Sequence, residues 1–143
     1  MIARALVLTA VVLTLGDWAV AQNGDKDREK LQGRWVADKS DKDITAEFKF
    51  DKNTFTITLE AKGNKDSYKG TFKIDPSKKP SEMDLTVTEG DKYKGETSLA
   101  IYRIDGDTLK WCAAEPGKKD RPKDFPEKAG DGKYLYLVLK RAK

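Results

Sequence analysis

The sequence predicts an all-β domain, an antiparallel up-and-down barrel of eight strands with a short N-terminal helix. Apolar and polar residues alternate with a period of two in about eight segments, which is the pattern of strands that bury one face. Turn residues separate these segments at intervals of roughly 8–12 residues, as in sandwiches and barrels. Nearly every connection has the length of a hairpin, so consecutive strands should pair as a meander, which loses its exposed edges by closing.

Residues 99–114 contain the clearest of the predicted hairpins. Asp105, Gly106 and Asp107 separate two apolar runs, and Asp-Gly is a strong hairpin signal because glycine adopts a positive φ without steric cost. After the turn, Trp111 shares a face with the residues two positions before and after it. We expect this face to point into the barrel.

The remaining elements are predicted by the same two signals, alternation and turn residues. Residues 25–32 favour a short helix, since acidic residues stand near its start and Gly33 can end it. Gly70 indicates a bend or bulge within its strand. Residues 115–132, rich in Pro, Gly and charge, are the longest irregular stretch. The other predicted strands span residues 34–38, 45–50, 55–59, 68–74, 83–88 and 133–140.

Residues 1–21 predict a signal peptide rather than part of the fold. Arg4 precedes an apolar segment at residues 5–15 that is too short to span a bilayer comfortably, and Ala19-Val20-Ala21 is a cleavage signal. We therefore expect residues 22–143 to be a single exported domain, periplasmic or extracellular, with no membrane span after cleavage. An uncleaved N-terminal anchor is the alternative interpretation.

The composition narrows the classes of function. The chain carries 28 Lys and Arg against 24 Asp and Glu, and the two signs are interspersed, which favours a solvated surface over a nucleic-acid interface. There is no His, and Cys112 is the single Cys, so nucleophile pairs with His, closed zinc sites and an internal disulfide are excluded. We expect a monomer that is not an enzyme and holds no metal or cofactor. A hydrolase that uses carboxylates alone is the enzymatic alternative.

The start of the first strand, Gly33-Arg34-Trp35, resembles the G-x-W motif of lipocalins and lipocalin-like domains. In that superfamily the Trp closes one end of the barrel, and an Arg near the end of the last strand lies across it. Arg141 matches that Arg by position. The resemblance therefore implies a lipocalin-like barrel in which Trp35 and Arg141 form a structural cation–π pair.

A second resemblance is carried by residues that are spaced along nearly all of the predicted domain. They are Leu31-Gln32-Gly33 with Trp35, Gly70 to Asp75 with Lys79-Pro80, Ile101-Tyr102, Asp105 to Lys110 with Cys112, Arg121-Pro122 with Phe125, and Leu137 to Arg141. In these residues the domain as a whole more closely resembles a family of small secreted domains found in planctomycetes. The resemblance implies no activity, ligand or catalytic residue.

A barrel of eight strands has room inside for side chains or for one small ligand. We expect an exported, non-enzymatic binding barrel for a small apolar or amphipathic ligand. Its predicted cavity-lining residues are Phe48, Phe50, Phe55, Ile57, Phe72, Leu85 and Trp111. Five tyrosines could supply polar groups to such a cavity or lie half-buried at its rim: Tyr68, Tyr93, Tyr102, Tyr134 and Tyr136.

The alternative is a filled barrel that serves as a protein-interaction or structural domain of the cell envelope. Such a domain would bind an envelope protein through residues 115–132. Within this loop, Arg121 and Phe125 could form a recognition surface. They could equally form a lid, with Phe125 over the barrel mouth and Arg121 paired locally.

Overall fold

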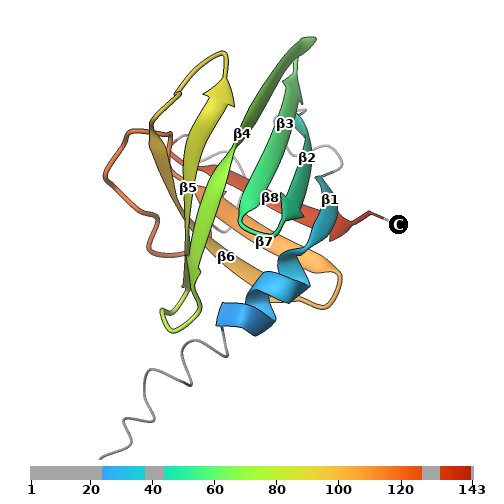
Figure 1. The fold of residues 1–143 in the computed structure, drawn as a ribbon, viewed down its shortest axis with the longest axis vertical. Helices are drawn as coiled ribbons and strands as arrows, with labels where there is room; N and C mark the ends of the chain where they lie inside the picture. Colours follow the sequence, from blue (N-terminus) through green and yellow to red (C-terminus); the bar gives the residue numbers. More distant parts are fainter. Residues whose placement is uncertain (1–23, 38–43, 127–132, 143) are drawn as a thin grey trace, which may run out of the picture.

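The computed structural model describes residues 24–37, 44–126 and 133–142. Within them, a helix at residues 24–31 precedes eight strands (Figure 1). The predicted signal peptide, residues 1–21, and residues 127–132 of the long loop lie outside the described residues. No helix in the described part of the chain has the length and apolar character needed to cross a membrane. The strands are β1 (Gly33–Ala37), β2 (Ile44–Asp51), β3 (Thr54–Ala61), β4 (Asn64–Asp75), β5 (Ser81–Gly90), β6 (Thr97–Asp105), β7 (Thr108–Ala113) and β8 (Leu135–Arg141).

The eight strands form one closed antiparallel barrel. Each strand pairs with the next along the chain, and β8 returns to pair with β1, where Trp35 stands opposite Arg141. The predicted fold class is therefore confirmed, and the up-and-down order is that of a lipocalin-like barrel. Closure leaves no strand with an unpaired edge in this sheet.

Alternation places the inward side chains where the sequence predicts them. In β2 the buried residues are Ala46, Phe48 and Phe50, and in β3 they include Phe55 and Ile57. The register pairs Phe50 with Phe55 across a two-residue turn, so the apolar faces of both strands meet inside the barrel.

The predicted irregularity at Gly70 is a shift of register between β4 and β5. The shift falls between Lys69 and Gly70, and a Cβ at Gly70 would lie 1.8 Å from the carbonyl oxygen of Thr86. No side chain fits there without moving the neighbouring backbone. Gly70 therefore allows β5 to approach β4 closely and bend with it.

The N-terminal helix closes one end of the barrel, the lower end in Figure 1. Leu31 and Trp35 are fully buried there, and the indole Nε1 of Trp35 donates a hydrogen bond of 2.8 Å to the carbonyl oxygen of Leu31. The guanidinium of Arg141 lies 4.2 Å from the centre of the Trp35 ring and also donates to the carbonyl oxygens of Gln32 and Lys30. Arg141 thus covers the Trp35 ring and caps the end of the helix.

Two further contacts fix the helix to this end. The hydroxyl of Tyr102 donates a hydrogen bond of 2.7 Å to the carboxylate of Asp27. The side-chain amide of Gln32 accepts a bond from the backbone N–H of Lys52 at 2.6 Å, in the turn between β2 and β3. The helix is therefore tied to both sides of the barrel and has little freedom to uncover it.

The described part of the long loop lies on the outer wall of the barrel, beside β5 and β6 (Figure 1). Arg121 donates to the carbonyl oxygens of Met83 and Ala100 and pairs with the carboxylate of Asp84. The ring of Phe125 packs at 6.0 Å from the ring of Tyr136, which alternation places on the outer face of β8. Of the two alternatives for this loop, the lid does not hold for Phe125, because its ring packs against Tyr136 on the outer wall.

This loop also buries a small apolar cluster outside the barrel. Ile101 and Cys112 are buried, yet they alternate with the inward residues of β6 and β7 and do not belong to the main core. Pro122 is fully buried as well. Burial raises the pKa of the Cys112 thiol to about 11, so the thiol stays protonated at neutral pH.

Candidate functional site

A pocket of about 370 Å³ occupies the half of the barrel away from the helix. Its volume falls within the roughly 300–1,000 Å³ of pockets that bind small molecules. Apolar side chains from β3, β5 and β7 form much of its wall. The lining residues are Phe55, Ile57, Leu59, Tyr68, Leu85, Val87, Tyr93, Ser98, Trp111, Ala113, Ala114, Glu115, Pro116, Lys133, Tyr134 and Leu135.

Trp111 separates the pocket from the filled half of the barrel. Its ring packs edge-on against Phe48, with the ring centres 4.8 Å apart. Beyond Phe48, the ring of Phe50 packs against that of Phe72 at 5.0 Å. Side chains therefore fill the barrel from the helix up to Trp111, and the space begins above it.

Four of the seven predicted cavity residues line the pocket: Phe55, Ile57, Leu85 and Trp111. The other three, Phe48, Phe50 and Phe72, belong to the same buried core as these four but do not line the pocket. That expectation is corrected for a simple reason. Alternation shows which residues point inward, but not at which depth along the barrel axis they lie.

Two polar groups lie deep in the pocket wall. Ser98 is buried, and its hydroxyl donates a hydrogen bond of 2.7 Å to the carbonyl oxygen of Ala114. The indole Nε1 of Trp111 is buried and has no hydrogen-bond partner among the described residues. An unsatisfied buried donor costs about 1–3 kcal/mol. Because this N–H is shielded from solvent, the Trp111 ring and not its donor forms the open surface of the pocket floor.

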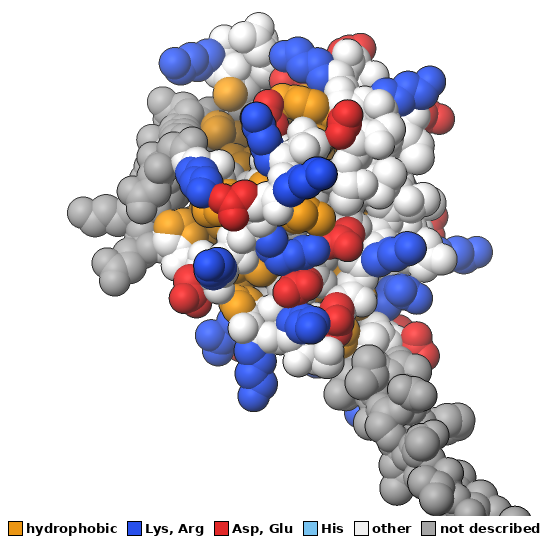
Figure 2. Space-filling view, turned by 90° about the vertical axis from the view of Figure 1, so that its left-hand side faces the viewer, with side chains coloured by type: hydrophobic (Ala, Val, Ile, Leu, Met, Phe, Trp, Pro, Cys, Tyr) orange, Lys and Arg blue, Asp and Glu red, His pale blue; other side chains and the backbone are white. Residues whose placement is uncertain are grey.

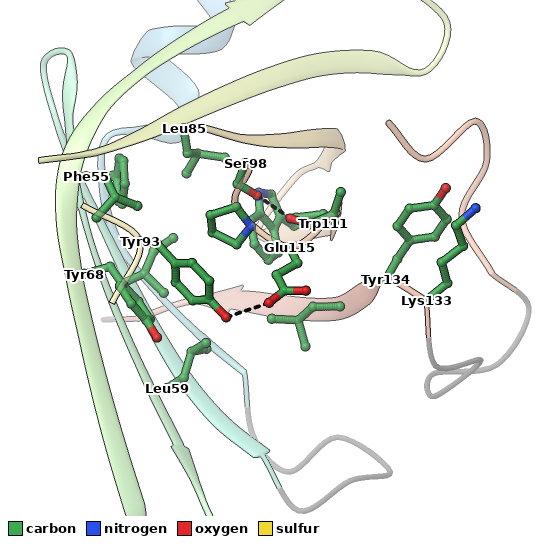
Figure 3. A pocket seen from close by; sticks show the side chains of 16 residues that line it. Phe55, Leu59, Tyr68, Leu85, Tyr93, Ser98, Trp111, Glu115, Lys133 and Tyr134 are labelled. Atoms are coloured by element: carbon green, nitrogen blue, oxygen red, sulfur yellow. Dashed lines mark hydrogen bonds between the residues drawn. The ribbon is translucent and has the colours of Figure 1, made fainter. Parts of the chain in front are cut away.

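The mouth of the pocket is crossed by Tyr93 (Figure 3), whose hydroxyl donates a hydrogen bond of 2.8 Å to the carboxylate Oε1 of Glu115. Its ring centre lies 6.0 Å from that of Tyr68. Tyr93 has a φ of 67°, a left-handed conformation that is uncommon for a bulky residue. The β5–β6 loop thus holds Tyr93 in a strained position that turns its ring back toward the pocket.

The hydroxyls of Tyr68 and Tyr93 both stay protonated more readily than a free tyrosine. The hydrogen bond to Glu115 is the main cause that raises the pKa of Tyr93. Burial is the main cause that raises the pKa of Tyr68, followed by the charges of Asp66 and Asp91. Burial and nearby negative charge both disfavour the tyrosinate form.

Sequence reasoning weighed Tyr68, Tyr93 and Tyr134 as polar groups of a cavity, and all three line the pocket. It missed Ser98 and Glu115. The alternation of β6 and β7 could have predicted that both residues point inward. Ser98 continues the inward face of β6, and Glu115 continues that of β7 one step beyond its end.

The other predicted site residues lie away from the pocket. Trp35 and Arg141 form their pair at the closed end, and Arg121 and Phe125 lie on the outer wall. Among the described residues, no group of three or more Asp, Glu, His or Cys side chains is arranged to hold a metal ion. Comparison of the chain with protein-family models, curated proteins and solved structures finds no significant match.

Proposed function

We propose that this chain is an exported, non-enzymatic binding protein that holds a small apolar or amphipathic molecule in the pocket above Trp111. The observation that carries the proposal is the pocket itself, about 370 Å³ in a barrel that is otherwise packed. A mainly apolar wall with a few polar groups is typical of sites for small molecules. The apolar part of the ligand would lie against Phe55, Ile57 and Leu85.

The unpaired indole N–H of Trp111 also supports a ligand. The donor is buried at the pocket floor, where its loss of hydration is not offset by a bond to any described residue. A carbonyl, ether or hydroxyl oxygen of a bound molecule would accept that bond once a side chain that encloses the N–H moves aside. An unpaired donor lowers the stability of the folded chain when the pocket is empty, and a hydrogen bond to a bound molecule would offset part of that loss.

Export is proposed from the pattern of residues 1–21. From the residues that carry the resemblance, we also propose that the chain belongs with the small secreted domains of planctomycetes and acts as a monomer. Its surface suits a soluble setting. Figure 2 shows Lys and Arg interspersed with Asp and Glu on one face, with hydrophobic areas only between them.

The alternative, an interaction domain that binds an envelope protein through residues 115–132, has less support. Arg121, the most connected side chain of the described part of this loop, is already paired with Asp84 and Glu82 of the chain's own barrel. Pro122 is buried and Phe125 packs on Tyr136. The largest side chains of the described part of this segment are therefore already packed or paired within the chain, although Lys118, Lys119, Lys123 and Asp124 are exposed.

A ligand screen tests the proposal. The purified protein is examined by native mass spectrometry and thermal unfolding with fatty acids, aromatic compounds and cell-envelope lipids. A true ligand should bind once per chain and raise Tm, because binding at a hundredfold excess over Kd stabilises the folded state by about 2.7 kcal/mol. Absence of binding across all three classes would contradict the proposal.

A pocket-filling variant locates the binding. Ala113→Phe introduces a ring at a small, buried residue of the pocket wall and should abolish binding while the chain stays folded. Val138→Phe is the matched control, because Val138 is 43% exposed on the outer face of β8. If both variants bind equally well, the ligand is not in this pocket.

A further inference from the structure

The pocket presents one type of charge to its interior. Glu115 supplies the one carboxylate among the described lining residues, and Figure 3 shows its head group turned toward Tyr93 in the middle of the pocket. The bond from the Tyr93 hydroxyl, 2.8 Å long, holds the carboxylate in this position. A ligand that enters the mouth must therefore pass close to a fixed negative charge.

The one lining ammonium of the described residues does not balance that charge. Lys133 and Tyr134 lie at the edge of the pocket in Figure 3 and point away from its centre. The Lys133 ammonium pairs with the carboxylate of Asp120, and both side chains are more than half exposed. The Lys133 charge is thus neutralised outside the pocket and screened by solvent.

Aromatic faces stand beside the carboxylate. The rings of Tyr68 and Tyr93 lie at 6.0 Å with a tilt of 43°, so they do not stack flat on each other. The electron-rich face of such a ring attracts a cation, and an adjacent carboxylate strengthens the attraction. Asp66 and Asp91 lie close enough to act on Tyr68 and add to the negative field.

We propose that the pocket prefers an amphipathic ligand with a cationic head, such as an ammonium group, which pairs with Glu115 beside the rings of Tyr68 and Tyr93. The apolar tail of the ligand lies below, on Trp111. This inference rests on the proposed function and adds the chemical class of the ligand's head. Glu115 is the counter-ion, and Tyr93 is its positioning residue.

Three probes with the same tail and different heads test the preference: octylamine, octanol and octanoate. Their affinities for the purified protein are compared by calorimetry at neutral pH, where the amine is protonated and the acid ionised. We expect octylamine to bind about fivefold more tightly than octanol, because a partly exposed ion pair contributes up to about 1 kcal/mol. Octanoate should bind more weakly than octanol, and added salt should reduce the octylamine preference.

The variant Glu115→Gln removes the charge and keeps an acceptor for the Tyr93 hydroxyl. It should lower the affinity for octylamine to that for octanol and leave octanol unchanged. Glu60→Gln is the matched control, since Glu60 is exposed on β3 next to an inward lining residue and its loss changes the net charge equally. Glu60→Gln should keep the octylamine preference.

The possible failures are distinguishable. If octanoate binds as tightly as octylamine, the cationic head is wrong while the binding barrel stands. If Glu115→Gln keeps the octylamine preference, Glu115 is not the counter-ion. If none of the three probes binds and the wider ligand screen is also negative, the proposed function fails and this inference with it. If Glu60→Gln abolishes the preference as well, net charge rather than Glu115 is responsible, and the assignment of the counter-ion is overturned.

Discussion

The two ends of this barrel are built by the same eight strands, yet one end is filled and the other is hollow. At the helix end, Trp35 is fully buried, its indole N–H is bonded to Leu31, and Arg141 covers its ring. At the opposite end, Trp111 is buried with an unpaired indole N–H, and the space above it is open to a ligand. The same residue type therefore closes one end and lines the floor of a pocket at the other.

The difference teaches that strand alternation alone does not decide whether a barrel is hollow. The filled end gains its plug from outside the strands, because the helix places Leu31 over Trp35. The hollow end has no such plug among the described residues. At that end Tyr93, in the loop between β5 and β6, lies over the mouth, and its hydroxyl donates a hydrogen bond to the carboxylate of Glu115. Four predictions break or sharpen this comparison.

Trp35→Ala should have the largest effect. The side chain is fully buried in the filled end, so its loss leaves a large cavity and removes the bond to Leu31. We expect the free energy of unfolding to fall by about 3–5 kcal/mol, measured by urea denaturation followed by circular dichroism. A loss below about 1 kcal/mol would contradict the tight packing of this end.

Arg141→Ala should have the next largest effect, because Arg141 both stacks on Trp35 and caps the helix. We expect a loss of about 2–3 kcal/mol in the free energy of unfolding. Arg34→Ala is the matched control. Arg34 pairs with Glu47 on the surface, where both side chains are about half exposed, and its loss should cost less than about 1 kcal/mol. Equal effects would refute a closing role for Arg141.

The two tryptophans can be compared directly by replacing each with Phe. Trp35→Phe removes an N–H that is hydrogen-bonded and leaves the carbonyl oxygen of Leu31 without that donor. Trp111→Phe removes an N–H that has no partner among the described residues. The first change should therefore cost about 1–2 kcal/mol more than the second in the free energy of unfolding. If both cost the same, the indole of Trp111 is satisfied in solution, and the polar floor of the pocket needs revision.

The smallest effect is a pH dependence at the filled end. Burial, aided by the bond to Asp27, raises the pKa of Tyr102 above its usual value of 10.0. Above that pH the Tyr102 hydroxyl loses its proton in the unfolded chain but keeps it in the folded chain. The contribution of Tyr102 to the free energy of unfolding is therefore fully present below pH 10 and is lost as the pH rises. Stability should therefore decline less steeply above about pH 10 in Tyr102→Phe than in the parent chain. The slopes are measured by urea denaturation, and equal slopes would mean that Tyr102 is not buried.

Much of the fold was accessible from the sequence. Alternation located the strands, Asp105-Gly106-Asp107 marked a hairpin, and Gly70 marked the irregularity between β4 and β5. These features depend on contacts between neighbours in the chain or on the conformational limits of single residues. The Trp35–Arg141 pair was accessible only through a family resemblance, because its members lie at opposite ends of the chain.

The site was only partly predictable. Phe48 and Phe55 are both inward and aromatic, yet only Phe55 lines the pocket, and the alternation of β2 and β3 does not separate the two. The position of Glu115 depends on the backbone of the β5–β6 loop, which brings Tyr93 within 2.8 Å of it. Such pairings across a barrel mouth arise from the closed sheet and not from local sequence.

The most direct test of the two-ended barrel is to follow the indole N–H resonances of Trp35 and Trp111 by nuclear magnetic resonance during titration with octylamine. The account predicts that the Trp111 signal shifts in a saturable manner, because the ligand lies on its ring, while the Trp35 signal stays in place behind Phe48 and the helix. A Trp35 signal that moves as far as that of Trp111, or a Trp111 signal that does not move, would contradict it.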